Sequence, residues 1–281
     1  MKTIGFIDYY LSEWHADNYP LWIKEICEKT GKEFCVAYAW AEMDKSPIDG
    51  KTTDEWCKEF NVQQCNSIAE VCEKADYVLI LAPSNPEKHL QYAKEVFKFG
   101  KNTYIDKTFA PDKATAEEIF ALAENYGVKF FSSSALRYAE ELTGKENAKA
   151  VMTTGEGSNL EEYIIHQIEM VVKLLGVGAK QVRVENAFDR YTCSVKYVDD
   201  RQATLIFAPC LPFSACATNP NGTSEFSLVL NEDYFLSLLS DILRFYEEGT
   251  TSFDTQQTLE VMKIREGIIK AKNHIGEWLP L

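Results

Sequence analysis

The sequence predicts an α/β protein with a doubly wound parallel sheet in its N-terminal part and a second, α+β part with a mixed or antiparallel sheet. Two patterns lead to this fold class. Short apolar runs alternate with helix-like segments from Thr3 to Ser132, and after about Arg137 strand-like runs follow one another, with helices before and after them. A chain of 281 residues is long enough for two domains, which we expect at residues 1–137 and 138–281.

In the first domain, strands are expected at short apolar runs, which are typical of strands buried on both faces. These runs are Thr3–Ile7, Phe34–Trp40, Tyr77–Ala82, Asn102–Ile105 and Val128–Ser132. The helices expected between them are Tyr19–Thr30, Thr53–Phe60, Ser67–Lys74, Pro86–Phe99 and Lys113–Tyr126. Alternation with short connections favours right-handed crossovers and a parallel sheet, whose ligand crevice lies at the carboxyl ends of the strands.

In the second domain, a helix is expected at Leu160–Leu175, and strand-like runs follow it before two closing helices. The runs are Gln181–Ala187, Arg190–Val198, Arg201–Ala208 and Glu225–Leu230, and the helices are Glu232–Glu248 and Thr255–Asn273. Asp199-Asp200 lies between two of the runs and predicts a tight hairpin connection. Strands grouped in this way favour an α+β arrangement.

The composition argues against several classes of partner. The formal net charge is −14, from 29 Lys and Arg against 43 Asp and Glu, which disfavours nucleic acid and anionic membrane surfaces. No uncharged apolar run approaches the ~20 residues needed to span a bilayer, and the N-terminal apolar stretch is too short for a signal peptide. The eight cysteines have irregular spacings and no CxxC pair, which is typical of reduced thiols, so we expect a cytoplasmic protein.

Three segments carry motifs that point to one family. Asp76–Ala110 predicts a strand that ends in Ala82-Pro83, a helix, and a second strand that closes on Asp106-Lys107-Thr108. Ala114–Tyr138 adds another helix and strand, and the third segment is a helix that begins with Glu162-x-x-x-His166. Together they resemble the Gfo/Idh/MocA family of glucose–fructose oxidoreductases and inositol dehydrogenases, in which the corresponding motifs are a Thr-Pro or Ala-Pro step, Glu-Lys-Pro and Asp-x-x-x-His. The C-terminal helix and its Gly-x-x-Leu-Pro ending also fit, so the resemblance covers nearly the whole chain.

This resemblance implies a Rossmann-like first domain and an NAD(P)-dependent oxidoreductase that transfers a hydride between nicotinamide and a sugar, polyol or related hydroxy compound. Lys107 would polarise the reacting oxygen, and His166 would act as the general base. Glu162, where the family usually has Asp, would orient the imidazole or bind a neighbouring hydroxyl. Arg137 and Tyr138 are the expected substrate contacts. The resemblance also implies a homo-oligomer and a small-molecule carbohydrate as substrate. A metal site built from Asp8, Glu13, His15 and Asp17 is conceivable, but these residues have no recognised metal-binding spacing and we expect no metal.

Residues that follow the predicted strands are expected to line a dinucleotide. They are Asp8, Tyr9, Tyr10, His15, Glu42, Pro83, Ser84, Asn85, His89 and Asp106. Glu42 follows the second strand, where an acidic residue binds an adenosine ribose and favours NAD over NADP.

The turn after the first strand departs from the family, because no glycine stands between Asp8 and His15. Such glycines let backbone N–H groups approach a pyrophosphate, and here the side chains of Tyr10 and Glu13 would occupy that space. A carboxylate at Asp8, ~5 Å from a phosphate at an effective ε ≈ 20, costs roughly 3 kcal/mol, or about a hundredfold in affinity. Either the nucleotide lies in an altered pose, or this chain binds none.

Alternative interpretations stay open for each group. Lys107 is otherwise a surface lysine at a strand end, paired with Asp106, and His166 belongs to a solvated polar stripe that Glu169 and Lys173 continue. The polar residues after the first strand, His15 and Asn18 among them, are otherwise the cap and first turn of a helix. At the level of function, the alternatives are a cofactor-free carbohydrate-binding or regulatory protein and a non-redox lyase or hydrolase on the same scaffold.

Overall fold

The computed structural model describes residues 1–281, which divide into two compact units. The first unit comprises Met1–Ser133 and Leu238–Ser252, and the second comprises Ser134–Ser237 and Phe253–Leu281. The boundary lies shortly before the expected one at residue 137. The segment Leu238–Ser252, which we expected in the second domain, belongs to the first.

The sheet of the first unit is parallel throughout, with the strand order β3-β2-β1-β4-β5-β6. Its strands are β1 (Lys2–Asp8), β2 (Phe34–Ala41), β3 (Gln63–Gln64), β4 (Tyr77–Ile80), β5 (Thr103–Ile105) and β6 (Phe130–Phe131). This order confirms the doubly wound sheet, because the chain runs outward from β1 in one direction and outward from β4 in the other. The short, exposed β3 consists of two glutamines and has no apolar run that would have predicted it.

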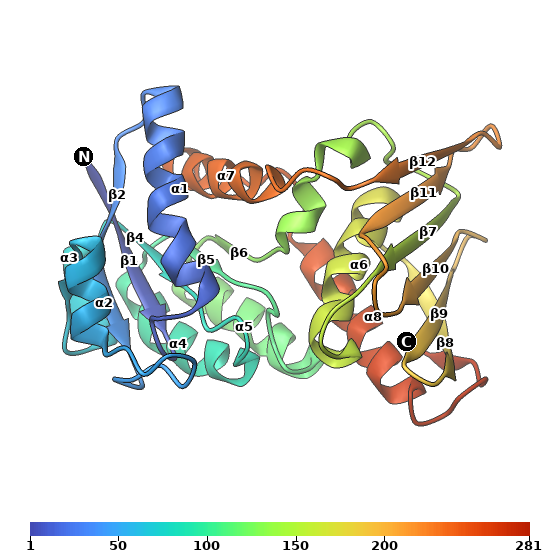
Figure 1. Ribbon diagram of the computed structural model, residues 1–281, viewed down its shortest axis with the longest axis horizontal. Coiled ribbons are helices and arrows are strands. Elements are labelled where there is room, and N and C mark those ends of the chain that lie inside the picture. Colours follow the sequence, from blue (N-terminus) through green and yellow to red (C-terminus); the bar gives the residue numbers. More distant parts are fainter. The chain divides into compact units, whose positions relative to one another are not determined.

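The helices of this unit are α1 (Trp14–Thr30), α2 (Thr53–Phe60), α3 (Ile68–Lys74), α4 (His89–Val96) and α5 (Lys113–Tyr126). Figure 1 shows α1 on one side of the sheet and α4 and α5 on the other. The helix expected over Pro86–Phe99 is divided into α4 and two single 3₁₀ turns, Pro86–Lys88 and Phe97–Phe99. The first helix begins at Trp14, earlier than the expected Tyr19, because Glu13 caps it.

The late helix α7 (Tyr234–Glu248) joins the first unit through its apolar face. The Tyr246 hydroxyl donates to the carbonyl oxygen of Val78 in β4 at 2.7 Å, and its ring stacks on Tyr77. Phe245 packs edge-on against Phe131 of β6. Such contacts between distant parts of the chain leave no local sequence signal, which is why the domain prediction missed them.

The sheet of the second unit is mixed, with the order β12-β11-β7-β10-β9-β8-β13. Its strands are β7 (Ala150–Gly155), β8 (Ala179–Ala187), β9 (Arg190–Tyr197), β10 (Gln202–Phe207), β11 (Ser214–Thr218), β12 (Ser224–Leu228) and β13 (Leu279–Pro280). The strands β7 and β10 are parallel, and the other neighbours are antiparallel. The hairpin at Asp199-Asp200 is confirmed between β9 and β10. The small and polar residues of β7 and β11 hid these two strands from the sequence analysis.

Two helices, α6 (Leu160–Leu175) and α8 (Gln256–Ala271), pack together and against this sheet. The bounds of α6 are those expected from the sequence, since Asn159 caps its start and Gly176 follows its end. None of the helices in the structure has the length and apolar character that crossing a membrane requires.

Candidate functional site

At the carboxyl edge of the first sheet, Asp8 closes β1 and lies inside the fold, with 1% of its surface exposed. One carboxyl oxygen, Oδ1, accepts the N–H groups of Tyr9 at 2.6 Å and Ala82 at 2.9 Å, and the other, Oδ2, is buried without a hydrogen-bond partner. Burial, and then the neighbouring charge of Glu13, raises the pKa of Asp8 well above its usual range. We expected Asp8 to contact a cofactor, but the structure uses it to tie the ends of β1 and β4 together.

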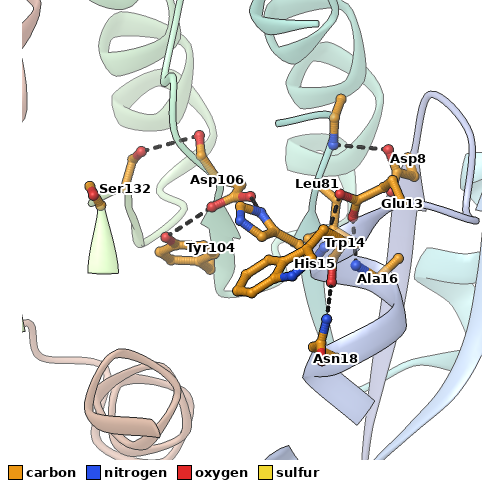
Figure 2. A network of polar contacts seen from close by, with 12 residues as sticks. Asp8, Glu13, Trp14, His15, Ala16, Asn18, Leu81, Tyr104, Asp106 and Ser132 are labelled. Atoms are coloured by element: carbon orange, nitrogen blue, oxygen red, sulfur yellow. Dashed lines mark hydrogen bonds and ion pairs between the residues drawn. The ribbon is translucent and has the colours of Figure 1, made fainter. Parts of the chain in front are cut away.

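The side chain of Glu13 occupies the N-terminus of α1 (Figure 2). Its Oε2 accepts the N–H of His15 at 2.9 Å, and its Oε1 accepts the N–H of Ala16 at 2.5 Å. Only 7% of Glu13 is exposed, and burial raises the pKa of its carboxyl although His15 and these N–H groups act against that rise. In a Rossmann-like sheet, the first-turn N–H groups of this helix are the donors that bind a pyrophosphate. Here the chain satisfies two of them with its own carboxyl group.

The turn before Glu13 is also covered. Leu11 and Ser12 are buried, and the loop after β2 makes hydrogen bonds with the turn. The Ser12 hydroxyl donates to Asp49 at 2.9 Å, and the Ser46 hydroxyl donates to the carbonyl oxygen of Ser12 at 2.7 Å. No residue from Asp8 to Glu13 has a positive φ, so this turn differs in backbone conformation from one built on glycines.

His15 and Asp106 form a buried pair that joins α1 to the end of β5 (Figure 2). Nδ1 of His15 contacts Oδ2 of Asp106, and the imidazole stacks on the ring of Tyr19. The Tyr104 hydroxyl lies 3.4 Å from the other oxygen of Asp106. Burial raises the pKa of Asp106, but His15 and Lys107 outweigh it and hold the pKa below its usual value. Asp106 therefore remains an anion that orients the histidine ring. Both residues were expected to contact a cofactor, and the structure turns them toward each other.

His89 was also expected to line a cofactor, and this expectation is wrong. The imidazole is 0% exposed, with Nδ1 at 2.9 Å from the carbonyl oxygen of Phe109 and Nε2 at 2.6 Å from that of Leu81. Burial lowers the pKa of His89. The ring lies in the interior at the start of α4, and both of its nitrogens already face backbone carbonyl oxygens.

The other expected cofactor residues lie at or near the surface of the first unit. Glu42 directly follows β2, as predicted, and accepts hydrogen bonds from Lys88 and the Tyr92 hydroxyl. Tyr9 is half-buried with the Lys88 ammonium 5.0 Å from its ring centre. The loop after β4 and the turn after β1 hold the rest of this group: Tyr10, Pro83 and Asn85 are half-buried and Ser84 is exposed.

Lys107 is half-buried and directly follows the buried Asp106. Its position after a core strand is the one predicted. In the second unit, His166 lies on α6 and is half-buried, and its Nδ1 is 2.7 Å from the hydroxyl oxygen of the buried Ser134. The N–H of Ser134 donates to Glu169 at 3.2 Å, so one serine links the histidine to a buried carboxylate.

Arg137 was expected to reach the substrate, and it is instead part of a buried ion pair. Its Nε lies 2.7 Å from Oε2 of Glu169, and the exposed fractions of the two side chains are 6% and 5%. Nη1 donates to Gln257 at 2.7 Å, and Phe253 lies against the guanidinium plane. The alternative of a solvated polar stripe on α6 is therefore wrong at Glu169.

The remaining expected site residues of the second unit are half-buried. Glu162 stands one turn before His166 in α6, and its backbone N–H is capped by Asn159 at 2.8 Å. Tyr138 ends the 3₁₀ turn Ala135–Tyr138.

Sequence reasoning missed the roles of Ser134 and Glu13. Ser134 stands in a run of three serines without a motif of its own. Glu13 was seen as an obstacle to a nucleotide, whereas a negative charge is also favourable at a helix N-terminus, where it can accept first-turn N–H groups. Across the chain, no group of three or more His, Cys, Asp or Glu side chains is arranged to hold a metal ion.

Residues 46–134 match the model of the Gfo/Idh/MocA oxidoreductase family, described as having an NAD-binding Rossmann fold. The matched segment is less than half of the chain, and over this segment the chain is similar to members of the family. The match begins after β1, α1 and β2, the elements that surround the turn without glycine. Over 63 residues the chain is 35% identical to the uncharacterized oxidoreductase YhhX of Escherichia coli, which corresponds to 22% of this chain and 18% of that protein. The matched stretch is thus less than a fifth of the length of this relative.

Several solved structures share the fold of this protein. GenD2 from gentamicin A biosynthesis, solved in complex with NAD, has a TM-score of 0.79 at 10% identity, covering 100% of this chain and 97% of its own. UDP-N-acetylglucosamine 3-dehydrogenase GnnA from Acidithiobacillus ferrooxidans has a TM-score of 0.75 at 13% identity, over 96% and 97%. An NAD-binding oxidoreductase from Klebsiella pneumoniae has a TM-score of 0.75 at 12% identity, over 99% and 98%. At such identities, the likeness establishes the fold alone.

The dinucleotide that this family implies finds only part of its usual surroundings in this protein. Glu42 stands where an acidic residue binds the adenosine ribose. The pyrophosphate position does not fit, because Glu13 already binds the N–H groups of His15 and Ala16, and Asp8 and Asp106 place two more buried acids nearby. Other groups would have to hold the phosphates of a bound dinucleotide.

Proposed function

We propose that the protein is an oxidoreductase that acts on a hydroxyl group of a sugar, polyol or related compound. In this proposal, His166 accepts the hydroxyl proton and Lys107 stabilises the negative charge that develops on the same oxygen. NAD is the proposed redox partner, which the match of residues 46–134 to an NAD-binding family model supports, and the position of Glu42 favours NAD over NADP in this proposal. Glu162 and Tyr138 are the proposed substrate contacts, and the chain is proposed to work as a homo-oligomer in the cytoplasm.

The observation that carries this proposal is the fixed orientation of His166. A continuous series of polar contacts leads to Nδ1 of His166. It runs from Gln257 to Arg137, then to Glu169, to Ser134 and finally to the imidazole. For the ring to accept a proton at Nε2, Nδ1 must carry the hydrogen and donate it to the Ser134 oxygen. A serine hydroxyl can accept this hydrogen, so the contact with Ser134 is compatible with the tautomer that the proposed general base requires.

A panel of sugars and polyols, assayed for oxidation with NAD and with NADP, tests the proposal. The His166→Ala and Lys107→Ala variants should each lower kcat by about 10²-fold or more on any substrate found. Ser134→Ala should lower kcat by less than His166→Ala does, because it removes a contact of the imidazole and leaves the imidazole itself in place. His274→Ala and Lys98→Ala remove exposed residues of the same two types and serve as controls. Unchanged turnover in both His166→Ala and Lys107→Ala would contradict the assignment.

A second candidate is a cofactor-free carbohydrate-binding protein, which the capping of α1 by Glu13 favours. In that case millimolar NAD or NADP leaves the melting temperature unchanged, while a sugar or sugar acid raises it.

A further inference from the structure

We infer that the Glu13 carboxyl group has replaced the pyrophosphate at the N-terminus of α1, so that this chain does not bind a dinucleotide through the first turn of that helix. The inference concerns this turn alone. It is independent of the role proposed for His166, which lies in the other unit.

The backbone N–H groups that would bind a pyrophosphate already have acceptors within the chain. A pyrophosphate at this position is held by N–H groups between the end of β1 and the first turn of α1. Here the N–H of Tyr9 donates to Asp8, and the N–H groups of His15 and Ala16 donate to Glu13. Acidic side chains of the chain itself have taken up these donors.

The space that a phosphate would need at the first turn of α1 is filled by side chains of the chain itself. Glu13 is buried, Leu11 and Ser12 beside it are buried, and the hydrogen bonds of Ser12 with Asp49 and Ser46 fix the turn under the loop after β2. The ring of His15 is fixed to Asp106, so the first turn of α1 cannot move away without breaking a buried contact. A phosphate would have to displace Glu13 and open this loop.

The acidic residues around this turn also disfavour a phosphate through their charge. Asp8, Glu13 and Asp106 are all buried at the same edge of the sheet, and Asp106 remains ionised. One ionised carboxylate ~5 Å from a phosphate lowers affinity by about a hundredfold. Glu13 excludes the phosphate by occupancy even when it is protonated. The family match accordingly begins at residue 46, beyond this turn.

Titration of the full-length protein with NAD, NADP and inorganic pyrophosphate tests this inference, with calorimetry for affinity and ¹⁵N NMR for the amides of His15 and Ala16. In the wild type, these two amide signals should stay in place at millimolar ligand, whether or not a dinucleotide binds elsewhere. Glu13→Gly is the variant to compare, because glycine is itself among the residues favoured at a helix N-cap. It should tighten binding of the dinucleotide by about tenfold to a hundredfold and make both amide signals shift.

Glu25→Gln is the matched control, because Glu25 is an exposed acid on the same helix and pairs with Lys29. The affinity of this variant for the dinucleotide should equal that of the wild type. Circular dichroism establishes that Glu13→Gly is folded. A saturable shift of the His15 and Ala16 amides in the wild type would overturn the inference. So would a folded Glu13→Gly variant with no gain in affinity.

Discussion

The buried ion pair between Arg137 and Glu169 gives the sharpest prediction of stability. We consider Glu169→Gln, which keeps the shape of the side chain and an oxygen for the N–H of Ser134 but removes the charge that faces Arg137. The two side chains are almost fully buried, and Nε and Oε2 are 2.7 Å apart. Nη2 of Arg137 is buried without a hydrogen-bond partner, and Glu169 is the carboxylate that pairs with the guanidinium.

The burial of the pair sets the size of the expected loss in the free energy of unfolding. At an effective ε ≈ 20 and ~4 Å between charges, the attraction is about 4 kcal/mol. Removing one partner of a buried pair leaves the other charge without compensation and costs about 3–5 kcal/mol of the free energy of unfolding. We expect Glu169→Gln to lose an amount in this range. The double variant Arg137→Met, Glu169→Leu should recover most of it, because no buried charge remains.

Urea unfolding followed by circular dichroism measures the loss, and hydrogen exchange in peptides of α6 locates it. Glu161→Gln on the same helix is the control, because its side chain and that of Lys272 are 42% and 32% exposed and such pairs contribute about 0–1 kcal/mol. If Glu169→Gln lost no more free energy than Glu161→Gln, the buried pair would not stabilise α6 and the supporting role assigned to it would fail.

Two further predictions concern the first unit. Because burial raises the pKa of Asp8 above the ordinary value of 3.8, the folded state binds a proton that the unfolded chain releases, and this contribution to stability is lost as the pH rises through the folded-state pKa. The melting temperature of Asp8→Asn minus that of the wild type should therefore grow as the pH rises above 3.8, and a constant difference would contradict the burial of this acid. Gly5→Ala would place a Cβ 2.3 Å from Cγ1 of Val71, so we expect it to cost about 1–3 kcal/mol in urea unfolding. Val71→Ala in the same chain should restore part of that loss, and no restoration would refute the steric explanation.

Much of the fold was predictable because its signals are local. Buried parallel strands such as Tyr77–Ile80 appear as short apolar runs, and the start of α6 after Asn159 appears as a cap before an amphipathic helix. The placement of α7 was not predictable, since the contact of Tyr246 with Val78 joins segments far apart in the sequence. β7 was missed because its Thr and Gly residues carry no apolar alternation.

The candidate site was predictable in its residue types and less so in their partners. Motif position correctly placed Lys107 after a core strand and His166 on a helix. No pattern in the sequence indicated that His15 would pair with Asp106, or Arg137 with Glu169, because each pair depends on tertiary packing. Polar residues at strand ends therefore provided candidates for a site, and burial decided which of these side chains face inward.

The central claim is that Lys107 and His166 act on the same oxygen of one substrate. A double-mutant cycle tests it most directly, with kcat measured for the wild type, Lys107→Ala, His166→Ala and the double variant on the best substrate of the panel. Residues that act as a unit are strongly non-additive, so the account predicts a double variant about as slow as the slower single variant. Two losses that multiply independently would contradict it.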